Sequence, residues 1–124
     1  MRQGVVILGH GSKLDETNNE IIQITKTLQE ADKNRLYEIA FLSVGNPKMS
    51  QAVEILIKKG VEKIIIMPMF LFTGSHVQVD IPDILELQKK QYPNIKFIAA
   101  GHFGTHSGVA DIIRERIEEA AGLL

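Results

Sequence analysis

The fold is decided by one stretch of the sequence, Lys63-Ile-Ile-Ile-Met-Pro-Met-Phe-Leu-Phe-Thr-Gly-Ser-His-Val-Gln-Val-Asp-Ile-Pro-Asp83. Its first half, Ile64 to Phe72, is apolar without alternation, which is typical of a strand buried on both faces of a parallel sheet. Small, polar and titratable residues follow at once, among them His76. Asp80 and Pro82 then indicate the N-cap and first turn of a helix. The stretch predicts a buried parallel strand, a polar loop and a helix.

Three further strand–helix units surround this one. Short apolar runs mark the strands, and apolar residues spaced by three and four mark one face of each helix. Ser50 is predicted to cap the second helix and Gly60 to end it, while Asp15 or Thr17 is predicted to cap the first. The other predicted strands are Val5–Leu8, Tyr37–Val44 and Lys96–Ala100, and the other helices carry Ile21 to Ala31, Val53 to Ile57 and Val109 to Ala120. Four βα units in series predict a three-layer α/β fold, with a four-stranded parallel sheet and helices on both faces.

Composition excludes several classes of function. The net charge of −1 and the 23% of charged residues create no global field that would attract nucleic acid. The absence of cysteine excludes disulfides, thiolate metal sites and a cysteine nucleophile. The first apolar segment is too short for a signal peptide, and no apolar run approaches the roughly 20 residues of a membrane span. We therefore expect one cytoplasmic domain over residues 1–124, without membrane contact.

All four histidines lie in loops that follow predicted strands. His10 follows the first strand, His76 the third, and His102 and His106 the fourth. Because such loops leave a parallel sheet at the same edge, the four side chains should converge on the edge where open α/β sheets bind ligands. The competing interpretation of each is an ordinary loop histidine, and it is the favoured one for His102 and His106.

Two neutral imidazoles facing each other suit a divalent first-row metal such as cobalt, nickel, iron or zinc. A structural zinc site needs four ligands, so two histidines without cysteine favour an open, weak or transient metal site. Gly9-His10-Gly11-Ser12 could alternatively hold a phosphate, which would make the chain a nucleotide-binding regulatory module, but it matches neither the dinucleotide nor the P-loop motif. Ser12 and Ser75 lie outside a G-x-S-x-G motif, which disfavours a serine nucleophile.

Two motifs at a fixed spacing resemble a known family. Leu8-Gly9-His10-Gly11-Ser12 follows the first strand, and Pro68-Met-Phe-Leu-Phe-Thr-Gly-Ser-His76 leaves the third, followed by Asp80-Ile81-Pro82. Together they resemble the small CbiX-type sirohydrochlorin chelatases of the CbiX/SirB family, and residues 47–57 and 104–113 are also similar to it. The resemblance covers essentially the whole chain. It implies a chelatase fold, a homodimer, and ATP-independent insertion of cobalt or nickel into sirohydrochlorin, a carboxylate-rich tetrapyrrole, in cobalamin or related tetrapyrrole biosynthesis.

The resemblance also implies roles for particular residues. His10 and His76 correspond to the family's two metal-binding and catalytic histidines, which would hold the metal and accept the pyrrole protons. The positions expected to contact the substrate are Ser12, Ser43, Gly74 and Ser75, and helix N-termini with Lys13 or Lys48 could receive its carboxylates. The metal is then a substrate and no permanently bound cofactor is expected. The expected partners are sirohydrochlorin, a divalent metal ion and a second copy of the chain, with no nucleic acid.

One residue departs from the family pattern. The family usually has a glutamate at the end of the second strand, where this chain has Ser43. A hydroxyl has no negative charge to attract the cation and is a poor base near neutral pH. Ser43 therefore favours a rival interpretation, a non-enzymatic carrier of metal or tetrapyrrole on the same fold. Turnover distinguishes the two, because a carrier binds without forming a metallated product.

Overall fold

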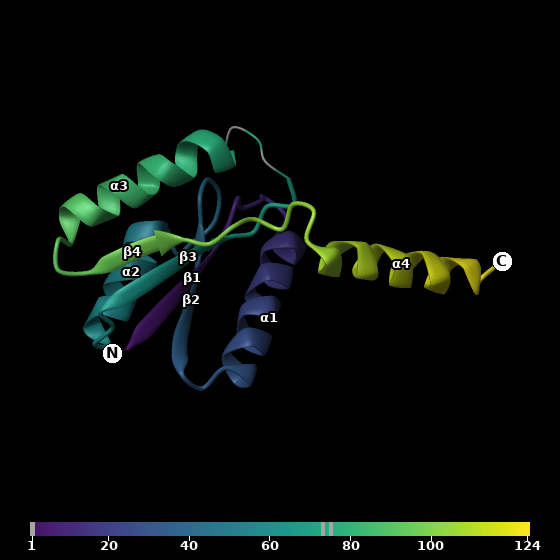
Figure 1. The fold of residues 1–124 in the computed structure, drawn as a ribbon, viewed down its shortest axis with the longest axis horizontal. Helices are drawn as coiled ribbons and strands as arrows, with labels where there is room; N and C mark the ends of the chain where they lie inside the picture. The colour runs from purple at the N-terminus through teal and green to yellow at the C-terminus, as the bar shows by residue number, and fades with distance from the viewer. Residues whose placement is uncertain (1, 73, 75) are drawn as a thin grey trace.

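A computed structural model describes residues 2–72, 74 and 76–124, with the side chains of His76 and Val77 outside the description. Strands and helices alternate along the chain (Figure 1). A π-helical turn, η1, precedes the third α-helix. The elements in order are β1 (Gln3–Gly9), α1 (Asp15–Ala31), β2 (Arg35–Phe41), α2 (Met49–Lys58), β3 (Lys63–Pro68), η1 (His76–Asp80), α3 (Ile81–Gln91), β4 (Lys96–Ala99) and α4 (Ser107–Ala121).

The four strands form one parallel sheet in the order β2-β1-β3-β4, which confirms the predicted fold class. Alternate residues of the strands face opposite layers. Val6, Ile64 and Phe97 pack with α2 and α3 in the main hydrophobic core. Val5 and Ile7 point to the other face, where they line a groove together with Leu28 of α1. Helices therefore lie on both faces of the sheet.

Several predicted boundaries were wrong. β2 ends at Phe41 rather than Val44, and β3 ends at Pro68 rather than continuing to Phe72. Asp80 is the N-cap of α3 and Pro82 lies in its first turn, as predicted, although Asp80 already has helical backbone angles because η1 leads directly into α3. Ser50 lies inside α2, whose N-cap is Lys48. The N-cap of α1 is Leu14, not Asp15 or Thr17. Among the described residues, no helix is long and apolar enough to cross a membrane.

The α1 face of the sheet is only partly covered. α1 packs over β2 and β1, and on the same side of β3 and β4 the sheet carries Ile65, Met67, Ile98 and Ala100, of which Ile98 is 63% exposed. We call these four residues the open face. α4, whose position follows β4 in the chain, does not cover it but projects away from the sheet (Figure 1).

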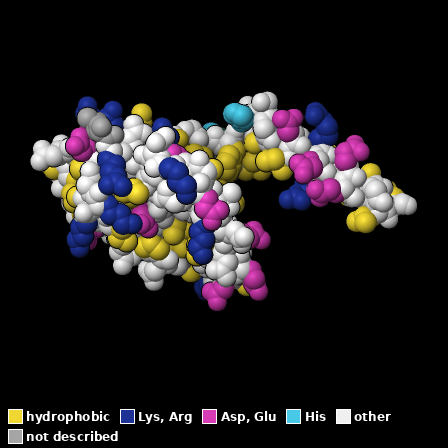
Figure 2. Space-filling model, turned by 90° about the horizontal axis from the view of Figure 1, so that it is seen from below, with side chains coloured by type: hydrophobic (Ala, Val, Ile, Leu, Met, Phe, Trp, Pro, Cys, Tyr) yellow, Lys and Arg dark blue, Asp and Glu magenta, His cyan; other side chains and the backbone are white. Residues whose placement is uncertain are grey.

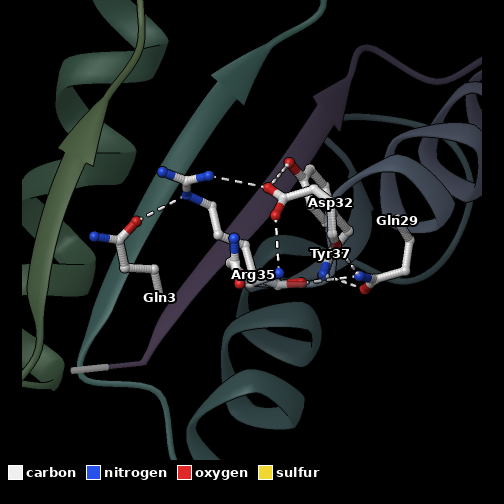
Figure 3. A network of polar contacts seen from close by, with 6 residues as sticks. Gln3, Gln29, Asp32, Arg35 and Tyr37 are labelled. Carbon is white, nitrogen blue, oxygen red and sulfur yellow. Dashed lines mark hydrogen bonds and ion pairs between the residues drawn. The ribbon is translucent and has the colours of Figure 1, made fainter.

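A polar network fixes the turn from α1 into β2 at the amino edge of the sheet (Figure 3). The Asp32 carboxylate accepts hydrogen bonds from the Tyr37 hydroxyl at 2.8 Å and from Arg35 at 3.0 Å. Arg35 also donates to the Gln3 side chain at 2.8 Å. The Gln29 amide donates to the Asp32 and Arg35 carbonyls and accepts from the Tyr37 N–H at 2.9 Å. The network joins α1, β1 and β2 at the edge opposite the histidine-bearing loops.

We expect Asp32→Asn to lower the melting temperature by a few degrees at pH 7. The Tyr37 hydroxyl, and next Arg35, hold the pKa of Asp32 below its ordinary value, while burial and Asp32 raise the pKa of Tyr37. A lowered native pKa means that this stabilisation is present above the unfolded-state pKa, about 3.9, and is lost as the pH falls through the native pKa. Thermal melts from pH 7 to 2 should show the two proteins converging in acid. Asp111→Asn, which removes an exposed carboxylate, is the matched control and should leave the melting temperature unchanged.

Candidate functional site

The candidate site lies at the carboxyl edge of the sheet, where the strand order reverses. β1 has β2 on one side and β3 on the other, so the chain leaves β1 first toward one neighbour and later reaches the opposite one. At such a switch point the loops that follow the two central strands diverge, and ligands bind in the crevice between them. The two central strands are β1 and β3. Their loops carry His10 and His76, respectively.

Backbone hydrogen bonds hold the loop after β1 between its two neighbours. The Leu42 N–H donates to the Gly9 carbonyl and the Ser43 N–H to the His10 carbonyl, both at 2.8 Å. On the other side, the Met69 N–H donates to the Leu8 carbonyl at 2.8 Å. Pairing thus continues beyond the ends of β2 and β3, and it fixes the His10 backbone on the β2 side and the end of β1 on the β3 side.

The His10 ring is exposed at this edge, and its Nδ1 lies 3.2 Å from the Gly11 carbonyl oxygen. A carbonyl can only accept, so this contact favours the tautomer with the proton on Nδ1. In that tautomer Nε2 carries a lone pair. A histidine that binds a metal through one nitrogen usually donates from the other in this way.

Gly11 is required by its surroundings as well as by its own backbone. Its φ of 95° lies in the left-handed region, and a Cβ built there would lie 1.8 Å from the Val44 carbonyl oxygen. Any side chain at this position would force the loops after β1 and β2 apart. The glycine of the Gly-His-Gly-Ser motif therefore sets the close approach of these two loops.

Asn18 was missed by the sequence analysis. Its side-chain oxygen accepts from the Ser12 N–H at 3.0 Å, and its amide donates to the Ser12 carbonyl at 2.9 Å. The Ser12 hydroxyl accepts from the Leu14 N–H at 3.1 Å. Asn18 therefore clamps the backbone just after His10, while the Ser12 hydroxyl closes the turn into α1. The only sequence signal was an asparagine in the first turn of a predicted helix.

The loop after β3 is described in part. Gly74 is exposed with open space where a Cβ would lie, and its carbonyl accepts from the Gln78 N–H at 2.9 Å. Ser75 lies outside the described residues, and so does the His76 side chain. The backbone of His76 begins η1, in the connection that follows β3, and β3 is the strand next to β1. That the two imidazoles face each other stays a prediction.

Ser43 reaches the predicted edge, although β2 ends two residues before it. It is exposed, and its N–H is the group bonded to the His10 carbonyl. The Lys48 ammonium donates to the Ser43 carbonyl at 2.6 Å. The Lys48 ammonium therefore lies beside the position where a family glutamate is expected.

The loop after β4 contributes a structural cap. The His106 Nδ1 accepts from the Gly108 N–H at 3.0 Å, which makes His106 the N-cap of α4. His102 lies against Gly104, 3.2 Å from the Cβ that an alanine would place there. These contacts favour the interpretation of both as loop histidines.

Apolar side chains surround the two central loops. They come from all four strand-following loops and from η1, and each is at least 36% exposed: Leu14, Val44, Leu71, Phe72, Val79 and Phe103. All six belong to segments at the carboxyl edge of the sheet, and large exposed apolar side chains that gather in one region favour an interaction site. The edge therefore combines histidine with apolar surface, which suits a flat, partly apolar ligand. Within the part of the chain that the structure describes, no three His, Asp or Glu side chains are grouped so as to hold a metal ion.

Comparisons with known proteins agree on one family. The CbiX family model matches residues 4–120. The sirohydrochlorin cobaltochelatase of Priestia megaterium is 35% identical over 93% of this chain, which covers 37% of that protein. The sirohydrochlorin cobaltochelatase of Sulfurisphaera tokodaii is 32% identical over 94% of this chain and 92% of that one. Among solved structures, the sirohydrochlorin chelatase SirB of Bacillus subtilis subspecies spizizenii, in complex with cobalt, superposes with a TM-score of 0.90 at 24% identity, over 96% of this chain and 51% of that chain.

The relatives differ in length. The chain spans 37–51% of three curated relatives that it matches, and nearly the whole of others. The longer proteins therefore contain a further stretch of comparable or greater length beside the part that matches.

Proposed function

The chain belongs to the CbiX family, and from this membership we propose that it is a sirohydrochlorin metal chelatase, one domain that inserts cobalt or nickel into the macrocycle without ATP. The relatives that support the reaction carry the name sirohydrochlorin cobaltochelatase. Others are named ferrochelatases, so iron belongs among the metals to be tested.

The reaction requires the protein to bind the metal and to accept protons. A divalent metal must be held weakly enough to be passed on, and the two pyrrole protons that it displaces must be accepted. A neutral imidazole can do both, because its lone pair binds either a metal ion or a proton. We assign these roles to His10 and His76.

The observation that carries this proposal is the position and tautomer of His10. It lies at the switch point of the sheet, and its Nδ1 contact with the Gly11 carbonyl supports the tautomer in which Nε2 carries the lone pair. The position of the His76 backbone, in the loop after the adjacent strand β3, supports His76 as a second metal-binding side chain. The exposed apolar residues around both loops support binding of the macrocycle.

The first turn of α1 is a poor place for substrate carboxylates. Asp15 and Glu16 lie there, and their charge opposes an incoming anion at the positive end of the helix. The first turn of α2 holds no acidic residue and has Lys48 as its N-cap. We therefore propose that carboxylates approach the α2 side of the site, near Ser43, rather than the α1 side near Ser12 and Lys13.

A homodimer is part of the proposal. The apolar edge of one copy offers one wall for a flat macrocycle, and two copies related by a two-fold axis, the commonest oligomeric symmetry, would offer two.

An absorbance assay tests the function. Sirohydrochlorin is incubated with cobalt, nickel or ferrous ion, with and without the protein, and the spectrum of the metallated product is followed. We expect the protein to accelerate insertion of at least one metal over the uncatalysed reaction. Binding of metal or pigment without any acceleration would establish the carrier that Ser43 favours.

Replacing Ser43 by Glu should increase the insertion rate about tenfold, equivalent to about 1.4 kcal/mol of barrier. A carboxylate beside His10 would attract the cation and accept a proton. The Lys48 ammonium, now bonded to the Ser43 carbonyl, would compensate part of the new charge. With saturating sirohydrochlorin, Ser43→Glu combined with Lys48→Met should therefore exceed Ser43→Glu alone, while its KM for sirohydrochlorin rises because a cation near the proposed carboxylate positions is lost. Ser43→Gln, which has the size without the charge, is the control, and equal rates for Gln and Glu would remove charge as the cause.

A further inference from the structure

We propose that a groove between α2 and α3 binds a small aromatic carboxylate whose ring carries an N–H donor, such as a pyrrole or indole acid. The groove has a volume of about 260 Å³ and lies on the side of the sheet opposite the open face. The inference does not depend on which reaction the protein catalyses. α4 stands clear of the body (Figure 2), and none of the described residues that line the groove belongs to it.

The buried amide of Gln88 is the observation that points to a ligand. Gln88 lines the groove from α3 and is only 3% exposed. Its side-chain oxygen is buried and has no hydrogen-bond partner within the described part of the chain. Such an acceptor destabilises the fold, because its bonds to water are lost and not replaced. Since the amide can turn about its terminal bond, the oxygen can face a ligand that donates a hydrogen bond.

The α2 side of the groove favours a negative charge. Lys48 and Ser50 line it at the start of α2, where unpaired N–H groups and the helix dipole attract anions. The first turn of α2 has no acidic residue, and none of the described residues that line the groove is acidic. The Lys48 ammonium gives one hydrogen bond to the Ser43 carbonyl and has two further hydrogens for a carboxylate.

The remaining lining is apolar and determines the body of the ligand. Phe41 and Met49 are buried, Leu42 and Ile84 are half-buried, and Leu87 is 61% exposed. Such walls favour an aromatic ring over a flexible polar chain. They also disfavour an ammonium as the donor to Gln88, because a charge loses its hydration in apolar surroundings. A neutral ring N–H, as in pyrrole or indole, meets both requirements.

Sirohydrochlorin itself does not have the required arrangement of groups. Its pyrrole N–H groups point to the centre of the macrocycle, where the metal replaces their protons, whereas its carboxylates lie on the rim. A rim that entered the groove would therefore offer Gln88 no donor. A single ring with one carboxylate arm offers both groups, so we assign the groove to a free small acid and not to the macrocycle.

Matched probes test the two polar contacts by nuclear magnetic resonance on the full chain. Indoleacetate has the ring N–H and the carboxylate, its benzofuran analogue has an ether oxygen in place of the N–H, and skatole lacks the carboxylate. We expect indoleacetate to shift the backbone resonances of Leu42, Ser50 and Leu87, with a Kd at least tenfold lower than those of the other two. Equal affinity for the two acids would show that water alone satisfies the amide. That result, shifts confined to other regions, or no binding at millimolar concentration would overturn the proposal.

Gln88→Met tests whether the amide is the acceptor. Methionine has the length of glutamine without its hydrogen-bonding groups, so the variant should melt at least as high as the natural protein. We expect its affinities for the two acids to lie within twofold of each other. Gln91→Met, at an exposed position of the same helix, is the matched control and should keep the tenfold preference. A preference that survives in Gln88→Met, or that is lost equally in Gln91→Met, would refute the role of Gln88.

The comparison of the probes on the natural chain tests the same contact without any substitution, so the proposal stays testable if a variant does not fold. No step measures metal insertion. Failure of this site and failure of the proposed activity are therefore distinguishable.

Discussion

His10→Ala should reduce the rate of metal insertion by about 100-fold or more, equivalent to at least about 2.7 kcal/mol of barrier. The variant lacks both the lone pair that receives the metal and the base that accepts a pyrrole proton. It should fold normally, because His10 is exposed and lies in a loop. His76→Ala should have an effect of similar size. Steady-state rates with cobalt and nickel, together with the affinity for each metal alone, measure the two roles separately.

His106→Asn is the matched control on the same edge of the sheet. Asparagine can still cap α4 through its side-chain oxygen, so the variant removes an imidazole without uncapping the helix. We expect its rate to stay within twofold of the natural protein. Full activity in His10→Ala or in His76→Ala would refute the two-histidine mechanism. An equal loss in His106→Asn would show that the effect is not specific to the switch-point loops.

Gly11→Ala should also lower the insertion rate strongly, although it removes no functional group. The new Cβ would meet the Val44 carbonyl oxygen at 1.8 Å, and the backbone would be held at a φ that alanine rarely adopts. The loops after β1 and β2 must then separate, which breaks the bond between Ser43 and His10. We expect at least a 30-fold lower insertion rate and a lower melting temperature.

Gly60→Ala separates the effect of backbone strain from that of the close contact with Val44. Gly60 has a similar φ of 89°, but no atom lies within 4 Å of the Cβ position. It should therefore lose stability through backbone strain and keep its activity per folded molecule. If Gly11→Ala behaves in the same way, with normal activity once folded, the close contact with Val44 is not needed for the reaction.

The sequence predicted the features that depend on local pattern. The unbroken apolar run after Lys63 identified β3 as a central strand, and the motif around His10 identified the turn at the switch point. The carboxyl ends of β2 and β3 were predicted too late in the chain, because apolar residues continue past the last residues of the regular strands. Asn18 could not be predicted, since its hydrogen-bond partners are fixed by the turn that it stabilises.

The spacing of apolar residues in α4 correctly predicted a helix with one apolar face. It could not indicate that no residue of the helix would be buried in the described structure, because periodicity reports which residues share a face and not what covers them. The direction in which α4 leaves the sheet depends on backbone hydrogen bonds between the loops after β3 and β4. The pattern of side chains in the sequence does not predict these bonds.

The projection of α4 has a consequence for how two copies could be joined into one polypeptide. Each of α1 to α3 begins near the carboxyl edge of the sheet and returns the chain to the amino edge, where the next strand starts. α4 instead carries the chain outward past the carboxyl edge, the side on which the proposed homodimer places the second copy. A short flexible peptide could then connect the C-terminus of one copy to the N-terminus of the other. In such a tandem protein the two halves would meet at a millimolar effective concentration, so its insertion rate per site should not fall on dilution, whereas that of separate chains should.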